Sequence, residues 1–262
     1  MPHYEIFALR YATVAERTRA DNMIFPDDHA AQMPIDFFVW AVRGEGRTII
    51  LDTGYDKASA DRRGRRWLRS PIEALRGIGV DPSEVRDVVL SHMHWDHAGN
   101  WRDFPKAKFH LQDAEMAYCT GRCMCHEPLR RPFDPEHVCE AVRHVFAERV
   151  KFHDGEAEIA PGITLHLVGG HSGGLQVMRV PTARGWVVLA SDAAHFWDNI
   201  RKRNPFPLLH NLEKMIEGWV RCEELADGPD HIIPGHDPAV LRRFPKLPGD
   251  PDGVRVDLPP AA

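Results

Sequence analysis

The sequence lacks the features of a membrane-spanning or exported protein. No apolar run approaches the roughly 20 residues that a transmembrane helix needs. The N-terminal stretch MPHYEIFALRYA has no basic region followed by an apolar one, so a secretory signal is not expected. Cysteine is scarce and odd in number, five among 262 residues, and without an export signal we expect reduced thiols. We therefore expect a cytoplasmic protein with no membrane partner.

Positive charge is also in short supply. The net charge is −5 with neutral histidines, so the chain offers no overall basic surface and no nucleic-acid partner is expected. The basic run DRRGRRWLR (61–69) is a local exception, which we interpret as a solvent-exposed face. With 43% hydrophobic and 27% charged residues the composition is that of an ordinary globular protein, and we expect one domain over residues 1–262.

Three of the cysteines, Cys119, Cys123 and Cys125, cluster beside His126. Such a group of side chains raises the question of a structural zinc ion. The C-x3-C-x-C spacing fits no standard zinc finger, so the sequence disfavours a metal at this cluster.

Apolar runs and turn signals predict an order of strands and helices. Strands are expected at residues 4–10, 35–42, 47–54, 87–91, 107–111, 163–169, 175–180, 185–191 and 231–236. Helices are expected at 71–79, from 81, at 112–119, from 134 and at 208–225, where Asp81 and Asp134 each precede a proline. Residues 11–34 look like a long loop, and the proline-rich tail after Phe244 looks irregular. This order favours an α/β (α+β) fold of two packed sheets with helices outside.

The stretch SHMHWDHAGN (91–100) concentrates four candidate metal ligands directly after a buried strand: His92, His94, Asp96 and His97. Imidazole nitrogens and carboxylate oxygens suit Zn²⁺ and related divalent ions. Residues two apart on an extended segment face the same way, so His92 and His94 can share one ion. Asp96 and His97 can point to a second ion. Four ligands are too few for two tetrahedral sites, so other segments must supply more.

Three further polar residues follow apolar strands in the same manner. His171 lies in LVGGHSGG, among glycines that allow a close approach of the backbone. Asp192 follows the run VVLAS, and His236 follows HIIPG. Because a carboxylate has two oxygens, Asp192 can bridge two ions.

The order H-x-H-x-D-H, then G-H-S, then S-D, then G-H resembles the metallo-β-lactamase superfamily. The resemblance runs from about Tyr4 to His236 and implies an αββα sandwich. Within the superfamily the chain is most similar to the N-acyl-homoserine lactonase group, by its size, its LDTG motif, its Asp192 and the long segment before PIDFFVW. This resemblance assigns His92, His94 and His171 to one metal ion and Asp96, His97 and His236 to the other, with Asp192 between them. It implies two divalent ions per chain, expected to be zinc, with manganese, iron or cobalt as alternatives.

The resemblance also implies a reaction. A hydroxide bridging the two ions would attack the carbonyl of a lactone, either an N-acyl-homoserine lactone or a related one. Asp96, Asp192 and His195 are the expected catalytic residues. Asp192 can orient the hydroxide and accept its proton, whereas His195 stands where the lactonase group has a tyrosine and can donate a hydrogen bond or a proton. Asp52, in LDTG, is the candidate partner for the free N–H of a ligand histidine.

A small-molecule lactone or ester needs a pocket. The aromatic residues in or near the candidate loops are Phe25, Trp67, Trp95, Trp101, Phe196 and Trp197. They are candidates to line an apolar pocket for an acyl chain or an aromatic ring. The long segment 11–34 is a candidate contact for a homodimer.

Other functions stay open. A glyoxalase II-like thioesterase keeps the same ligands, and another carboxylic ester hydrolase is a related alternative. Class B1 β-lactamases carry a cysteine where Asp192 stands, nucleic-acid-processing members carry a second inserted domain, and flavin-linked di-iron members have a glutamate where His94 stands. A metal-binding scaffold or sensor without activity would need the loss of the water site, and the complete ligand set argues against that.

Overall fold

The computed structural model describes residues 2–260, which form two β-sheets. The first sheet has the strand order β12-β13-β1-β2-β3-β4-β5-β6, and the second has the order β11-β10-β9-β8-β7. The strands of the first sheet are β1 (Glu5–Val14), β2 (Ile35–Gly44), β3 (Arg47–Leu51), β4 (Asp87–Val89), β5 (Lys108–Gln112), β6 (Val150–His153), β12 (Lys246–Leu247) and β13 (Asp250–Arg255). Those of the second are β7 (Glu156–Ala160), β8 (Ile163–Leu167), β9 (Gln176–Thr182), β10 (Gly185–Ser191) and β11 (Ile232–Pro234).

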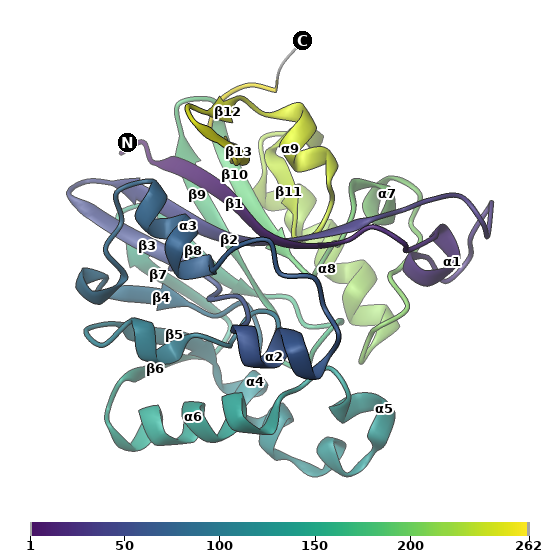
Figure 1. Cartoon of the computed structure of the whole chain (residues 1–262), viewed down its shortest axis with the longest axis horizontal. Coiled ribbons are helices and arrows are strands. Elements are labelled where there is room, and N and C mark those ends of the chain that lie inside the picture. Colours follow the sequence, from purple (N-terminus) through teal and green to yellow (C-terminus); the bar gives the residue numbers. More distant parts are fainter. Residues whose placement is uncertain (1, 261–262) are drawn as a thin grey trace.

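Helices cover the outer faces of both sheets. They are α1 (Arg19–Asn22), α2 (Lys57–Arg62), α3 (Pro71–Gly77), α4 (Asp113–Thr120), α5 (Glu127–Arg130), α6 (Pro135–Phe146), α7 (Trp197–Arg201), α8 (Leu212–Leu225) and α9 (Ala239–Arg243). In Figure 1, α2 and α3 lie in front of the first sheet and the strands of the second sheet lie behind it. No helix within residues 2–260 is both long and apolar enough to cross a bilayer.

Strand β2 explains why the sheets stack. Successive side chains of a strand point to opposite faces. Trp40 and Val42 pack between the two sheets with Leu189 of β10, whereas Val39 and Ala41 pack on the outer face. Because both faces of β2 are covered, its central residues 37–42 (FFVWAV) form a continuous apolar run. The predicted α/β fold of two sheets with helices outside is confirmed.

Several predicted elements are found where the sequence indicates them. The hairpin of β2 and β3 turns at Glu45 and Gly46, both of which have positive φ. Asp134 caps α6 by accepting a hydrogen bond from the backbone N–H of Glu136. The helix predicted from Asp81 is only a single 3₁₀ turn (Pro82–Glu84), because the chain enters β4 at Asp87.

The tail after Phe244 is not irregular, which corrects the sequence prediction. It forms β12 and β13, and β13 pairs antiparallel with β1, with Leu9 opposite Gly253. β13 lies between β12 and β1, and its proline, Pro251, precedes the residues that pair with β1, which begin at Gly253. The predicted loop 11–34 is also partly regular, since β1 continues to Val14 and α1 follows. Strands β6 and β7 have no counterpart among the predicted elements.

Candidate metal centre

The candidate ligands lie on loops that follow four different strands. His92 and His97 follow β4, His171 follows β8, Asp192 follows β10, and His236 follows β11. Strand β4 runs parallel to β3 and β5, and β11 runs parallel to β10. Loops at the carboxyl ends of parallel strands meet at the same edge of a sheet, where a rigid scaffold can display reactive groups.

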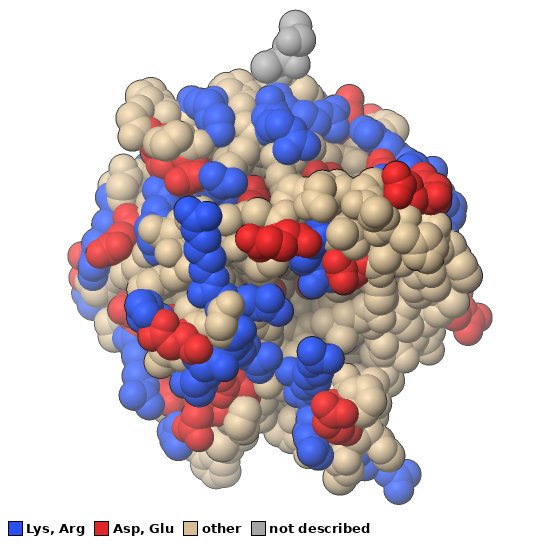
Figure 2. Space-filling view, turned by 45° about the vertical axis from the view of Figure 1, so that its right-hand side comes forward, with Lys and Arg blue, Asp and Glu red and all other residues tan. Residues whose placement is uncertain are grey.

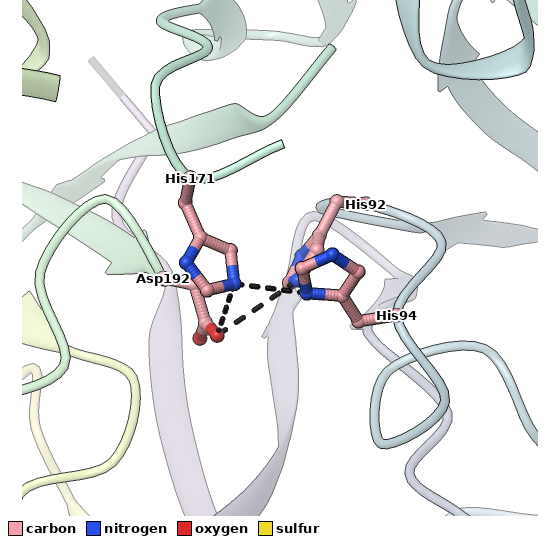
Figure 3. A group of neighbouring side chains, drawn as sticks. All are labelled: His92, His94, His171 and Asp192. Carbon is pink, nitrogen blue, oxygen red and sulfur yellow. Dashed lines mark hydrogen bonds and ion pairs between the residues drawn. The ribbon is translucent and has the colours of Figure 1, made fainter. Parts of the chain in front are cut away.

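The first group consists of His92, His94, His171 and Asp192, whose candidate ligand atoms all lie within 4.8 Å of one another. Figure 3 shows these side chains converging, His92 and His94 from one loop and His171 and Asp192 from two others. The Nε2 atom of His171 lies 2.9 Å from Nδ1 of His94 and 3.1 Å from Oδ2 of Asp192. The Nε2 atom of His92 lies 3.8 Å from the same carboxylate oxygen.

The second group consists of Asp96, His97 and His236. It meets the other oxygen of Asp192. Oδ1 of Asp192 lies 2.9 Å from Nε2 of His236 and 3.4 Å from Nε2 of His97. The two oxygens of one carboxylate therefore face two different groups of candidate ligands.

Several buried polar atoms of this cluster lack a hydrogen-bond partner within the described chain. They are Nε2 of His92, Nε2 of His97 and Oδ1 of Asp192. An unsatisfied buried polar atom costs roughly 1–3 kcal/mol, so three together are unfavourable unless something else contacts them. All three are typical metal-ligating atoms, and the residues therefore fit bound divalent cations.

The second nitrogen of His171 and of His236 is held from outside the cluster. Nδ1 of His171 lies 2.7 Å from the carbonyl oxygen of Leu208, and Nδ1 of His236 lies 2.7 Å from that of Asp36. A carbonyl oxygen only accepts, so both Nδ1 atoms must carry the proton. This tautomer leaves the Nε2 lone pair directed into the cluster, as metal ligation requires.

Asp52 holds the ring of His97 in the same way. Its Oδ2 lies 2.8 Å from Nδ1 of His97, and its carboxylate also accepts hydrogen bonds from the backbone N–H and the hydroxyl of Ser91. Asp52 has a φ of 62° and Ser191, beside Asp192, has a φ of 45°. Such backbone is strained for residues with a side chain and is typical of functional sites.

Protonation differs among the candidate ligands. Burial, together with the neighbouring rings of His97 and His94, lowers the pKa of His92 well below its ordinary value, so this imidazole is neutral. Burial would raise the pKa of Asp192, but the imidazoles of His195 and His236 outweigh it and hold the pKa well below the usual range. Burial alone would lower the pKa of His97 and His236, but the carboxylate of Asp192 outweighs it and raises the pKa of both imidazoles. Because only neutral imidazoles and ionised carboxylates bind cations, a bound cation would displace protons from these two rings.

His195 lies against the cluster as well. Its Nε2 is 3.1 Å from Oδ2 of Asp192, and its ring stacks on Phe206 with 3.7 Å between the ring centres. Its ligand atoms also group with those of Asp192 and His236. The side chain can therefore act as a hydrogen-bond donor or as a further metal ligand.

A cavity of about 360 Å³ opens over the cluster. His94, Asp96, Asp192, His195 and His236 lie along it, together with the aromatic side chains Phe37, Trp95 and Phe206. Phe37 and Phe206 were missed in the sequence, because a phenylalanine in an apolar strand or a proline-flanked loop carries no signal of a pocket.

Of the six aromatic residues expected at the pocket, only Trp95 lines this cavity. Trp101 is 1% exposed and packs in the core against Phe109 and His144. Phe196 and Trp197 border a separate cavity of about 380 Å³. Trp67 forms a β-bridge with Ala12, and Phe25 is 73% exposed at the surface. Proximity in sequence to a ligand does not decide the direction of a side chain.

Two other expectations concern groups outside the ligand set. The basic run 61–69 is not simply a solvent-exposed face, because Arg63 and Arg65 line the cavity, as do Arg17 and Arg131. Within residues 2–260, none of the cysteines near residue 120 belongs to a metal-ligand group.

Comparisons with known proteins identify the family of this chain. The family model described as the metallo-beta-lactamase superfamily matches residues 38–244. The N-acyl homoserine lactonase AttM of Rhizobium johnstonii is 25% identical over 238 residues, which cover 83% of this chain and 87% of that protein.

Solved structures share the fold. A quorum-quenching N-acyl homoserine lactone lactonase superposes with a TM-score of 0.73 at 20% identity, covering 91% of this chain and 94% of that one. A dizinc quorum-quenching lactonase in complex with its product N-hexanoyl-L-homoserine superposes with a TM-score of 0.69 at 16% identity, covering 90% and 88% of the two chains.

Proposed function

The chain belongs to the metallo-β-lactamase superfamily, and from that membership we propose that it is a binuclear metal-dependent hydrolase that opens a lactone ring. Membership of the family and the lactonases among the relatives support a metal-dependent hydrolase of ester bonds. The geometry of the site supports the two-ion centre.

The main observation that supports a two-ion site is that the two carboxylate oxygens of Asp192 face different groups of candidate ligands. One of its oxygens faces His171 and the other faces His236, so one carboxylate can contact two ions. His92, His94 and His171 would hold one ion, and Asp96, His97 and His236 would hold the other. Zinc suits this set of nitrogen and oxygen ligands, and manganese, iron and cobalt are alternatives.

When bound, two such ions would supply an acidified water at neutral pH and a Lewis-acid contact for a carbonyl oxygen. The protein's side chains do the rest. Asp192 can accept a proton from the attacking water, because its carboxylate is ionised and buried at the junction of the two groups. His195 lies 3.1 Å from Asp192 and can donate a hydrogen bond to an oxygen that gains charge during ring opening.

The reaction consumes one water per ring. The bond between the carbonyl carbon and the ring oxygen breaks, the water oxygen bonds to the carbonyl carbon, and one proton passes to the departing alkoxide. The product is a hydroxy acid, which ionises near neutral pH. An N-acyl-homoserine lactone is one substrate of this class, and its hydrolysis would make the protein a quorum-quenching enzyme.

Proton release measures this reaction directly. Protein loaded with zinc should acidify a weakly buffered solution of a lactone, and Asp192→Asn should abolish the signal. Thioesters are the comparison substrates, since a glyoxalase II-like enzyme would hydrolyse them with the same ligands. Thioester turnover far above that of every lactone would reject the lactonase in favour of the thioesterase.

A further inference from the structure

The cavity over the metal-ligand cluster is lined by four arginines from separate segments of the chain. Arg17 precedes α1, Arg63 and Arg65 follow α2, and Arg131 follows α5. The chain as a whole has a net charge of −5, so this is a local excess of positive charge. Figure 2 shows Lys and Arg side chains gathered around a recess near the middle of the face that it draws.

Two of these guanidinium groups are fixed by neutral acceptors. Arg17 donates from Nε to the side-chain oxygen of Asn22 at 2.6 Å, and from Nη2 to the backbone oxygen of Asp21 at 2.5 Å. Arg63 donates to the backbone oxygens of Arg131 at 3.2 Å and Phe133 at 2.9 Å. These bonds hold the guanidinium groups in place without neutralising their charge.

Aromatic rings of the cavity wall support the same two groups. The guanidinium carbon of Arg63 lies 4.6 Å from the ring centre of Trp95, and that of Arg17 lies 5.4 Å from the ring centre of Phe206. Both rings line the cavity, so both charges lie against its wall. The arrangement resembles a binding site more than a set of freely moving surface side chains.

Carboxylates lie near these arginines without pairing with them: the charge of Asp21 acts on Arg17, and that of Asp134 acts on Arg63. None of the four arginines forms an ion pair within residues 2–260, whereas Arg62, one residue before Arg63, pairs with Asp134 at 2.6 Å. Burial, and the nearby charge of Arg65, lower the pKa of both Arg17 and Arg63 below the ordinary value. Positive charges that are gathered and partly desolvated without a direct ion pair are unfavourable, and an anion bound between them would reduce that cost.

We propose that the substrate carries an anionic group, a carboxylate or a phosphate, which Arg17, Arg63 and Arg65 bind at the mouth of the cavity. This inference rests on the proposed lactonase function and narrows its substrate class. Guanidinium forks match the oxygens of carboxylates and phosphates and bind them with two parallel hydrogen bonds. A neutral N-acyl-homoserine lactone offers no such group, so the preferred substrate is an anionic lactone with its carbonyl on the metal-ligand cluster.

The test uses three γ-lactones that share one ring and differ in the substituent: a carboxylate, a phosphate or a neutral amide. The zinc-loaded enzyme should hydrolyse at least one anionic lactone with a kcat/KM about tenfold or more above that of the neutral one, since a hydrogen bond to a charged group is worth about that factor. The preference should shrink as salt is added, because ions screen exposed charges. Whichever anionic lactone is preferred identifies the group.

Two variants of the basic run separate this site from general surface charge. Arg65 is exposed, so Arg65→Ala should fold normally and should reduce the preference for the anionic lactone by about tenfold, mainly through KM. Arg66 is also exposed but does not line the cavity, so Arg66→Ala, with the same change of charge, should leave the preference unchanged. Circular dichroism of each variant checks the fold.

Different measurements test the anion site and the lactonase activity. Turnover of the neutral lactone tests the function alone. The corresponding γ-lactams, titrated calorimetrically into zinc-loaded protein, test the anion site even if no lactone is hydrolysed. The proposal is overturned if the neutral compounds react or bind as well as the anionic ones, or if Arg65→Ala and Arg66→Ala have the same effect.

Discussion

Asp192 is the residue on which the two halves of the candidate metal centre depend. Its Oδ2 faces His92 and His171, and its Oδ1 faces His97 and His236. No other side chain of the described cluster contacts both groups through two equivalent oxygens. A change at this position should therefore weaken both groups of ligands.

Asp192→Asn replaces one carboxylate oxygen by an amide nitrogen, which is a poor metal ligand. The substitution also removes one negative charge. We expect the purified variant to hold fewer than half of the ions held by the wild-type protein. Elemental analysis after dialysis without chelator measures this. Asp154→Asn is the matched control, because Asp154 is exposed and belongs to none of the groups of candidate ligands. Equal metal content in Asp192→Asn and wild type would reject the bridging role.

His195→Ala tests a different role at the same carboxylate. Removing one donor to a charge that develops during the reaction costs roughly 10²–10³ in turnover in comparable sites. We expect a loss of that size with unchanged metal content, and partial recovery in His195→Tyr, whose hydroxyl can also donate. Full activity in His195→Ala would make the residue a bystander, and a loss of metal would make it a ligand instead.

Among the elements, α4 and the loop after β8 hold the ligand-bearing segments together. The buried carboxylate of Glu115, on α4, accepts hydrogen bonds from the backbone N–H of Met93, the hydroxyl of Ser172 and the backbone N–H of Gly174. Met93 lies between His92 and His94, and Ser172 follows His171. One side chain of a helix thus ties two of the ligand loops to each other.

Gly174 is the point at which this packing is closest. A Cβ atom there would lie 2.1 Å from the backbone nitrogen of Glu115, so Gly174→Ala must push α4 away from the loop. We expect the free energy of unfolding to fall by about 1–3 kcal/mol or more, as overpacking does. Urea denaturation measures the change.

Gly77 provides the control for that substitution. It ends α3, and a Cβ atom there would meet nothing within 4 Å. Gly77→Ala should therefore leave the stability unchanged or raise it slightly. A Gly174→Ala protein as stable as Gly77→Ala would show that α4 and the loop can separate without cost.

For the molecule as a whole, stability should depend on pH through histidines outside the metal centre. His153 on β6 is buried, and its Nε2 lies 2.9 Å from Nδ1 of His110 on β5. Burial, and next the charge of His110, lower the pKa of His153 from 6.5 to about 4. Between these two values the unfolded chain binds a proton that the native protein does not, so the free energy of unfolding falls as the pH falls through this window.

Urea denaturation at pH 7 and pH 4.5 measures this dependence. His153→Gln keeps a polar side chain that does not titrate, so its stability should fall less over the same interval. Metal loss at low pH acts on both proteins and cancels in the comparison. An unchanged slope in His153→Gln would mean that His153 is not the group responsible.

Much of the architecture could be predicted from local patterns. The apolar run of β2, the turn at Glu45 and Gly46, and the Asp134-Pro135 start of α6 each depend on residues within a few positions of one another, so the sequence carries their signal. The same is true of the candidate ligands, because imidazoles and carboxylates directly after apolar strands stand out by their type and spacing. The structure brings His92, His171, Asp192 and His236 into one cluster.

Contacts between segments distant in the sequence determine the features that local patterns do not predict. The tail after Phe244 becomes β13 only because β1 offers an unpaired edge, and Trp101 turns into the core while Trp95, six residues earlier, lines the cavity. The arginines of the run 61–69 meet Arg17 and Arg131 only in the folded chain. Residue type and spacing set which groups can do chemistry, because those properties are local. Which side chains share the cavity with them was decided by tertiary structure, because it depends on the packing of segments that are distant in the sequence.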